Sequence, residues 1–225
     1  MLSSDQLPAS PFEPVGYLTA GARRFGSHTR EPHQSVYRRV RFDRELATSI
    51  ADAYLSAPVC EERAYAAYAA FCRETVQQFH FLVGRPEFGG LGVTVRVVDD
   101  DPYPDVSAMV ADIRRRQLRV FSTAASENPH PYLSDGENDM FRAVHDAFGH
   151  AASGRGFDPH GEEAAWLKHS TMYSRLARRA LTTETRGQTC ALVLRSPDGR
   201  FPRQKAALLP ARFSDPRSVR VSRSP

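Results

Sequence analysis

His145 and His150 lie five residues apart and are the pair of side chains in this chain best suited to bind a metal ion. Imidazole is the commonest protein ligand for borderline metals, so two neighbouring histidines supply half of a metal site. On an ideal α-helix this spacing would separate the two side chains by about 140°. Gly149 directly precedes the second histidine and allows the helix to end or distort there. Without such a distortion, His145 reads as a core histidine on an apolar helix face.

Glu184 is the predicted third ligand. We expect one long helix over residues 162–186, on which Glu184 falls within about 20° of three residues that favour burial. These three residues are Trp166, Tyr173 and Ala177. Burying an unpaired carboxylate costs several kcal/mol, so Glu184 needs a cation, either a metal ion or an arginine such as Arg178 or Arg186.

Three further polar residues are expected around the metal and are taken as catalytic candidates: Asp146, His169 and Arg186. His169 would contact the substrate or support a ligand from behind. Arg186 would hold Glu184 in place or bind an anionic substrate group. Glu163, about 60° from the stripe of Glu184, is a rival ligand, a supporting acceptor, or an acid favoured by the helix dipole.

The elements that would position these residues are mostly helices, with a few short strands. Apolar residues at spacings of three and four predict helices, and one β-branched run predicts a strand. The expected helices are 44–56, 61–83, 105–115, 138–148 and 162–186, and the expected strands are 93–98 and 118–121. We therefore predict an α+β fold with one catalytic-type domain over 41–210, a partly irregular arm over 1–40 and a flexible basic tail over 211–225.

Composition narrows the function classes. Apolar residues make up 41% and charged residues 25% of the chain, which is typical of soluble globular proteins. No apolar run is long enough for a transmembrane helix, and the first residues do not resemble a signal peptide. Three scattered cysteines, Cys60, Cys72 and Cys190, favour a reducing cytoplasm. The net charge of +4 is mild, and no aromatic residues interleave the basic clusters, so we expect no nucleic-acid partner.

Three stretches carry a family resemblance. They are Arg119–Phe121 with Pro131 and Tyr132, leading into Asp139–His150; Tyr173–Thr185; and Lys205–Leu209. In order and spacing they resemble the catalytic domain of the aromatic amino acid hydroxylases, which are pterin-dependent non-haem iron enzymes. The resemblance covers about 100 of the 225 residues. A segment over 176–188 also resembles one found in short bacterial and phage proteins of no known activity.

The resemblance implies that His145, His150 and Glu184 bind Fe(II), and that Asp146 takes the place of the acid on the pterin side. It implies a fold like that catalytic core, with tetrahydropterin as a cofactor. Two positions depart from the family. Arg179 stands where the family has a tyrosine near the iron, and His130 stands roughly where it has the arginine that holds the substrate carboxylate.

The leading interpretation is a mononuclear non-haem Fe(II) oxygenase or hydroxylase that uses dioxygen and a small-molecule substrate, because two histidines and one carboxylate form the facial triad of such enzymes. An alternative from His145 and Asp146 is an HD-type metal phosphohydrolase, for which His130 and Asp158 are the candidate additional ligands. A third interpretation is a non-enzymatic binding protein whose histidines are structural.

Overall fold

The structure is a computed structural model and describes residues 11–26 and 31–223. It is 56% helical with few, short strands, which confirms the expected α+β class. The α-helices are α1 (Gly16–Ala22), α2 (Gln34–Arg39), α3 (Arg44–Ser56), α4 (Tyr65–Val83), α5 (Val106–Arg114), α6 (Asp135–Val144), α7 (Pro159–Ser170), α8 (Ala177–Thr182) and α9 (Gln188–Arg195). Two π-helical turns, η3 (His145–Ala151) and η4 (Thr183–Gly187), continue α6 and α8. The strands are β1 (Val40–Arg41), β2 (Thr94–Val98), β3 (Gln117–Phe121) and β4 (Arg220–Val221).

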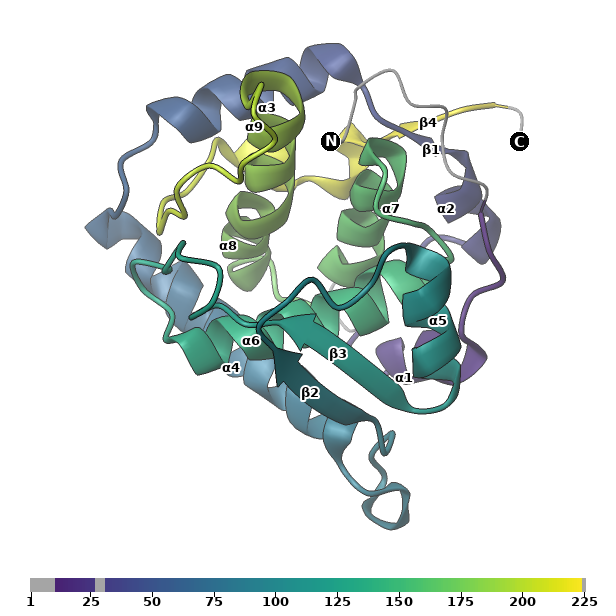
Figure 1. The fold of residues 1–225 in the computed structure, drawn as a ribbon. Coiled ribbons are helices and arrows are strands. Elements are labelled where there is room, and N and C mark those ends of the chain that lie inside the picture. Colours follow the sequence, from purple (N-terminus) through teal and green to yellow (C-terminus); the bar gives the residue numbers. More distant parts are fainter. Residues whose placement is uncertain (1–10, 27–30, 224–225) are drawn as a thin grey trace.

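Helix α4 carries the apolar face that the sequence predicts, and this face forms the centre of the main core. Tyr68, Phe71 and Leu82 are fully buried on it. The helix packs against α6 and α8, while α3 and α9 pack together around a smaller second core (Figure 1). The elements with the catalytic candidates therefore lie around a rigid central helix.

Strands β2 and β3 form a parallel pair in register from Thr94 with Gln117 to Val98 with Phe121. Helix α5 connects the two strands and begins at Asp105, whose side chain accepts a hydrogen bond from the amide of Ala108. The β-branched run and the following short helix thus fold as predicted. This unit lies on the outside of the helical body (Figure 1).

The long helix expected over 162–186 is interrupted. Helix α7 ends at Ser170, and α8 begins at Ala177 after a turn. Glu74 of α4 holds this turn, because its carboxylate accepts hydrogen bonds from the amide (2.8 Å) and the hydroxyl (2.7 Å) of Ser174. A helical wheel drawn across the break therefore does not describe which side chains share a face.

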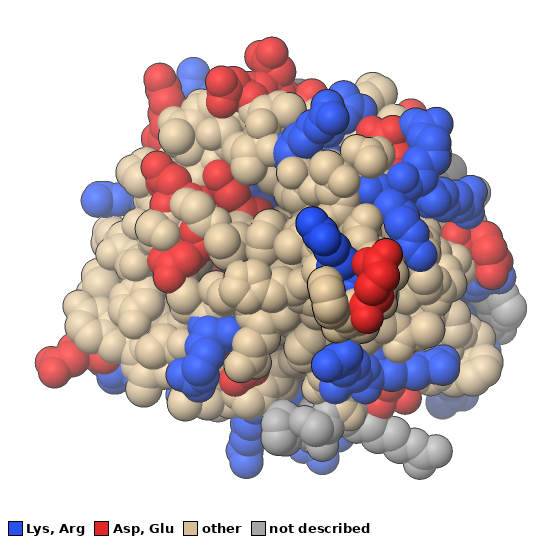
Figure 2. All heavy atoms as spheres, turned by 90° about the horizontal axis from the view of Figure 1, so that it is seen from below, with Lys and Arg blue, Asp and Glu red and all other residues tan. Residues whose placement is uncertain are grey.

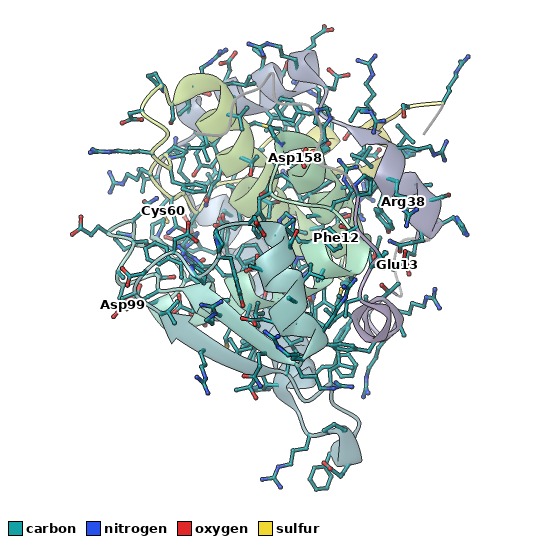
Figure 3. The ribbon with its side chains drawn as sticks, turned by 45° about the vertical axis from the view of Figure 1, so that its right-hand side comes forward. Phe12, Glu13, Arg38, Cys60, Asp99 and Asp158 are labelled. Atoms are coloured by element: carbon teal, nitrogen blue, oxygen red, sulfur yellow. The ribbon has the colours of Figure 1, made fainter. Side chains whose placement is uncertain are left out.

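The described part of the N-terminal arm docks onto the end of η3. The amides of Phe12 and Val15 donate to the carbonyls of Gly154 (3.1 Å) and Ala151 (3.0 Å). Glu13 forms an ion pair with Arg38 of α2 at 3.2 Å (Figure 3). These contacts cover carbonyl groups that would otherwise be left without partners beyond the π-helical turn.

The tail expected to be flexible contains a buried residue, Phe213, and the short strand β4. Strand β4 pairs antiparallel with β1, with Val40 opposite Val221. Phe213 packs in the core between α3 and α9, and this apolar contact explains why the described tail stays against the fold.

The basic run Arg114–Arg116 makes local contacts. Arg115 pairs with Asp112 at 2.6 Å, Arg114 donates to the carbonyl of Glu13 at 3.2 Å, and Arg116 lies 4.4 Å from the ring centre of Tyr17. On the face shown in Figure 2, basic and acidic side chains both occur beside a broad area of other residues. None of the helices within the described residues combines the length and the apolarity that a membrane crossing requires.

Candidate metal centre

The π-helical turn η3 brings the two histidines together. Helix α6 begins with a capping box, in which Ser134 and Glu137 satisfy one another's backbone amides, and it runs into η3 at His145. A π-helix has more residues per turn than an α-helix, so side chains five residues apart come to the same side. The rings of His145 and His150 lie with their centres 5.0 Å apart and almost perpendicular, at 84°. The distortion expected at the histidine pair is thus a π-helical turn, a feature frequent at functional sites.

Gly149 allows this geometry because its missing side chain leaves room for the ring of His145. A Cβ atom at this position would lie 3.1 Å from Nδ1 of His145 and 3.3 Å from Cβ of Ala165. Both approaches are tighter than ordinary van der Waals contact. Glycine therefore lets η3 pack closely on α7 without displacing the histidine.

Glu162 supplies the carboxylate that faces both histidines. It lies in the first turn of α7, which Asp158 caps by accepting hydrogen bonds from two backbone amides. Its carboxylate oxygens lie 3.6 Å from Nε2 of His150 and 4.0 Å from Nε2 of His145. Metal–ligand bonds of about 2.0–2.2 Å allow two ligand atoms to be up to about 4.4 Å apart. Within the described chain, these three residues are the group whose ligand atoms cluster closely enough to hold an ion.

The hydrogen bonding of His150 directs a lone pair toward Glu162. Nδ1 of His150 lies 3.2 Å from the carbonyl oxygen of Arg155, which can only accept, so Nδ1 carries the hydrogen. Burial lowers the pKa of His150, so its ring is neutral and Nε2 is left as an acceptor. An acceptor nitrogen and a carboxylate oxygen at 3.6 Å form no hydrogen bond, whereas a cation between them would attract both.

Burial also shifts the pKa values of the other two ligand candidates, in opposite directions. It lowers the pKa of His145 to about 4, so this ring is neutral near pH 7. It raises the pKa of Glu162, because an ionised carboxylate is costly without a counter-charge. The side chains of His145, His150 and Glu162 are 12%, 2% and 20% exposed, so one side of the group is open to small molecules.

Glu184, the predicted third ligand, lies in a different cluster, and this corrects the ligand set. Its Oε1 contacts the hydroxyl of Tyr68 and lies 3.1 Å from Nε2 of His130, and its Oε2 accepts from Gln188 at 3.1 Å. The physical reason is the break between α7 and α8, which removes Glu184 from the helix face that contacts η3. The side chain is buried, as predicted, but neutral donors satisfy it in place of a cation.

Arg186 and Glu163 form a buried ion pair with each other. Nε of Arg186 donates to Oε2 of Glu163 at 2.9 Å, and Nη1 donates to the carbonyl of Phe213 and the hydroxyl of Ser218. The guanidinium also lies 4.0 Å from the ring centre of Trp166. Neither predicted role of Arg186 is therefore seen, because its donors join α7 and η4 to the C-terminal segment.

His169 and Asp146 both lie next to the candidate centre. Nδ1 of His169, a fully buried residue, lies 3.2 Å from Nδ1 of His145, on the side of the ring opposite Glu162. Burial, together with the charge of Glu162, raises the pKa of Asp146 to about 8, and Arg142 acts in the opposite direction. The carboxyl group of Asp146 therefore favours its protonated form near pH 7.

His130 and Asp158, the two additional ligands that an HD-type phosphohydrolase would need, both make other hydrogen bonds. Nδ1 of His130 accepts from the amides of Tyr132 and Leu133, and its Nε2 faces Glu184. Asp158 caps the amino end of α7 (Figure 3). This arrangement disfavours that alternative.

A small depression adjoins Glu162, with room for about one water molecule. Its remaining lining residues are Phe42, Pro159, Glu163, Arg186, Thr189 and Cys190. Neither His145 nor His150 lines it, so the depression does not reach the histidine pair.

Sequence reasoning missed Glu162 although a signal was present. Glu162 and His169 are seven residues apart on the same helix, which places them on one face of α7. Because His169 was expected near the metal, the same face would have brought Glu162 there too.

Comparison of the chain with protein-family models, with curated proteins and with solved structures gave no significant match. The resemblance to the aromatic amino acid hydroxylases therefore stays a prediction from the sequence.

Proposed function

We propose that this protein is a mononuclear non-haem Fe(II) oxygenase that acts on a small molecule, with His145, His150 and Glu162 as the iron ligands. The observation that carries the proposal is the convergence of two neutral imidazoles on one carboxylate at 3.6 and 4.0 Å. Two histidines and one carboxylate, with the remaining positions open, are the ligand set of such enzymes.

Iron bound there would supply the redox chemistry with dioxygen, and the chain's own residues would bind, orient and move protons. His145 and His150 hold the site from η3, and Glu162 contributes the negative charge from α7. Asp146, which directly follows His145 and favours its protonated form near pH 7, is the candidate proton donor.

The test is oxygen consumption by metal-free protein that has been loaded with Fe(II) under anaerobic conditions. We expect oxygen uptake with tetrahydropterin or ascorbate as reductant, and its loss when the protein is loaded with Zn(II). The variant His150→Ala should lose the uptake, whereas His33→Ala, which changes an N-cap histidine outside the site, should keep it. Equal uptake by wild-type protein and His150→Ala, or metal-dependent phosphatase activity instead, would contradict the proposal.

A further inference from the structure

Gln78 of α4 is connected to the candidate metal centre through two hydrogen-bonded histidine rings. Its Oε1 lies 2.9 Å from Nε2 of His169, and Nδ1 of His169 lies 3.2 Å from Nδ1 of His145. Gln78 and His169 are both fully buried. The polar atoms of this hydrogen-bonded series therefore bond to one another rather than to solvent.

The orientation of the Gln78 amide follows from its second contact. Nε2 of Gln78 donates to the backbone carbonyl of Met172 at 3.4 Å. If the amide were flipped, its oxygen would face that carbonyl, and two acceptors would oppose each other. Oε1 therefore faces His169 as an acceptor.

This acceptor determines where both histidines carry their hydrogen. Nε2 of His169 must donate to Oε1 of Gln78, so Nδ1 of the neutral ring is an acceptor. Nδ1 of His145 must then donate to Nδ1 of His169, and Nε2 of His145 is left with its lone pair. That lone pair points to the side on which Glu162 lies.

We propose that Gln78 is a positioning residue, which fixes His145 through His169 in the tautomer that binds a metal ion through Nε2. The inference rests on the proposed ligand set. A metal-binding histidine usually donates a hydrogen bond from the N–H group of its other ring nitrogen to an outer partner. Loss of such a partner costs about 10–100-fold in metal affinity. Here the outer partner of His145 is itself a histidine, His169. The tautomer of His145 is therefore determined by Gln78, through two successive hydrogen bonds.

The packing around His169 keeps this chain of hydrogen bonds in place. The ring of His169 stacks on Phe141, with the planes within 7° and the centres 6.2 Å apart, and Tyr173 lies edge-on at 4.9 Å. Gln78 is on α4 and the two histidines are on α7 and η3, so the chain joins three separate elements.

The experiment compares wild-type protein with Gln78→Met, which has a similar shape but no acceptor, and with Gln78→Glu. In Gln78→Glu, burial favours the protonated carboxyl group, which can accept from His169 and donate to the carbonyl of Met172. Gln188→Met is the matched control, because Gln188 contacts Glu184 and takes no part in the hydrogen bonds that join Gln78, His169 and His145. Long-range nitrogen–proton NMR on the metal-free proteins reports which ring nitrogens carry hydrogen. Anaerobic titration with Fe(II) alone reports affinity.

We expect wild-type protein, Gln78→Glu and Gln188→Met to carry hydrogen on Nδ1 of His145 and Nε2 of His169. Gln78→Met should lose this single pattern and bind Fe(II) about 10–100-fold more weakly. Hydrogen on Nε2 of His145 in the wild type, or unchanged tautomers and affinity in Gln78→Met, would overturn the role of Gln78. The expected tautomers without any Fe(II) binding by the wild type would instead refute the proposed metal site.

Discussion

At the candidate centre, burial shifts the pKa values of neighbouring histidine and carboxyl side chains in opposite directions. It lowers the pKa values of His145 and His150 and raises those of Asp146 and Glu162. Each shift favours the uncharged form, as expected for groups removed from water. A cation bound between the histidines and Glu162 would offset the cost of keeping this buried carboxylate ionised.

Asp146 should make the stability of the metal-free protein depend on pH. Its pKa is about 8 in the fold against 3.8 for the unfolded reference, so the folded state binds more protons between these values. The free energy of unfolding must then decrease as the pH rises through this range. Asn at this position cannot ionise and lacks the decrease.

The stability difference between Asp146→Asn and wild-type protein should therefore grow in favour of the variant from about pH 5 to about pH 8, by up to about 1.4 kcal/mol per pH unit. Denaturant unfolding of both metal-free proteins at several pH values measures it. A difference that stays constant with pH would show that Asp146 ionises in the fold as it does in the unfolded chain.

At this scale residue types and spacing pointed to the histidine pair and His169, and the family resemblance added Asp146. They did not point to Glu162, because its place beside the histidines depends on which helix packs on η3. Glu162 and Glu184 are both buried glutamates in or near helices. Their different partners are determined by contacts between elements that are distant in sequence.

Among the helices and strands, those marked by a pattern in their own residues have bounds that agree best with the prediction. Helix α3 has its predicted bounds, and α4, α5, β2 and β3 lie within a few residues of theirs, because periodicity and β-branching are local properties. The break between α7 and α8 has no comparable signal. It depends on Glu74 of α4, which binds Ser174 from 100 residues away in the sequence.

The Glu163–Arg186 pair should contribute to folding and leave metal binding intact. Its side chains are 11% and 1% exposed, and removing one partner of a buried pair costs about 3–5 kcal/mol. We expect Glu163→Gln to lower the free energy of unfolding by roughly this amount, measured by denaturant titration, while the bound iron per folded chain stays unchanged.

Asp52→Asn is the matched control, because it breaks the Asp52–Arg195 pair, in which the side chains are 58% and 40% exposed. Such surface pairs contribute at most about 1 kcal/mol. Similar losses in the two variants would mean that the Glu163–Arg186 pair does not act as a buried link.

For the whole molecule, the candidate centre lies where several segments meet. The N-terminal arm closes the end of η3, α7 brings Glu162, and α4 supports the histidines from behind. Binding of an ion to this arrangement, and not to the unfolded chain, should raise the stability by about 2.7 kcal/mol at a metal concentration 100 times the dissociation constant. Metal occupancy of the proposed centre would then be coupled to the stability of the fold.

The most direct measurement is the number of iron ions bound per chain, determined by elemental analysis after anaerobic loading and gel filtration, in wild-type protein, Glu162→Gln and Glu184→Gln. We predict one ion per chain in the wild type and in Glu184→Gln. Loss of a group that only supports a ligand costs about 10–100-fold in metal affinity. In Glu162→Gln, which removes a proposed ligand, the affinity for Fe(II) should fall by at least this factor. Circular dichroism would check that both variants are folded. Loss of iron from Glu184→Gln with full retention in Glu162→Gln would contradict the ligand set and restore Glu184 as the third ligand.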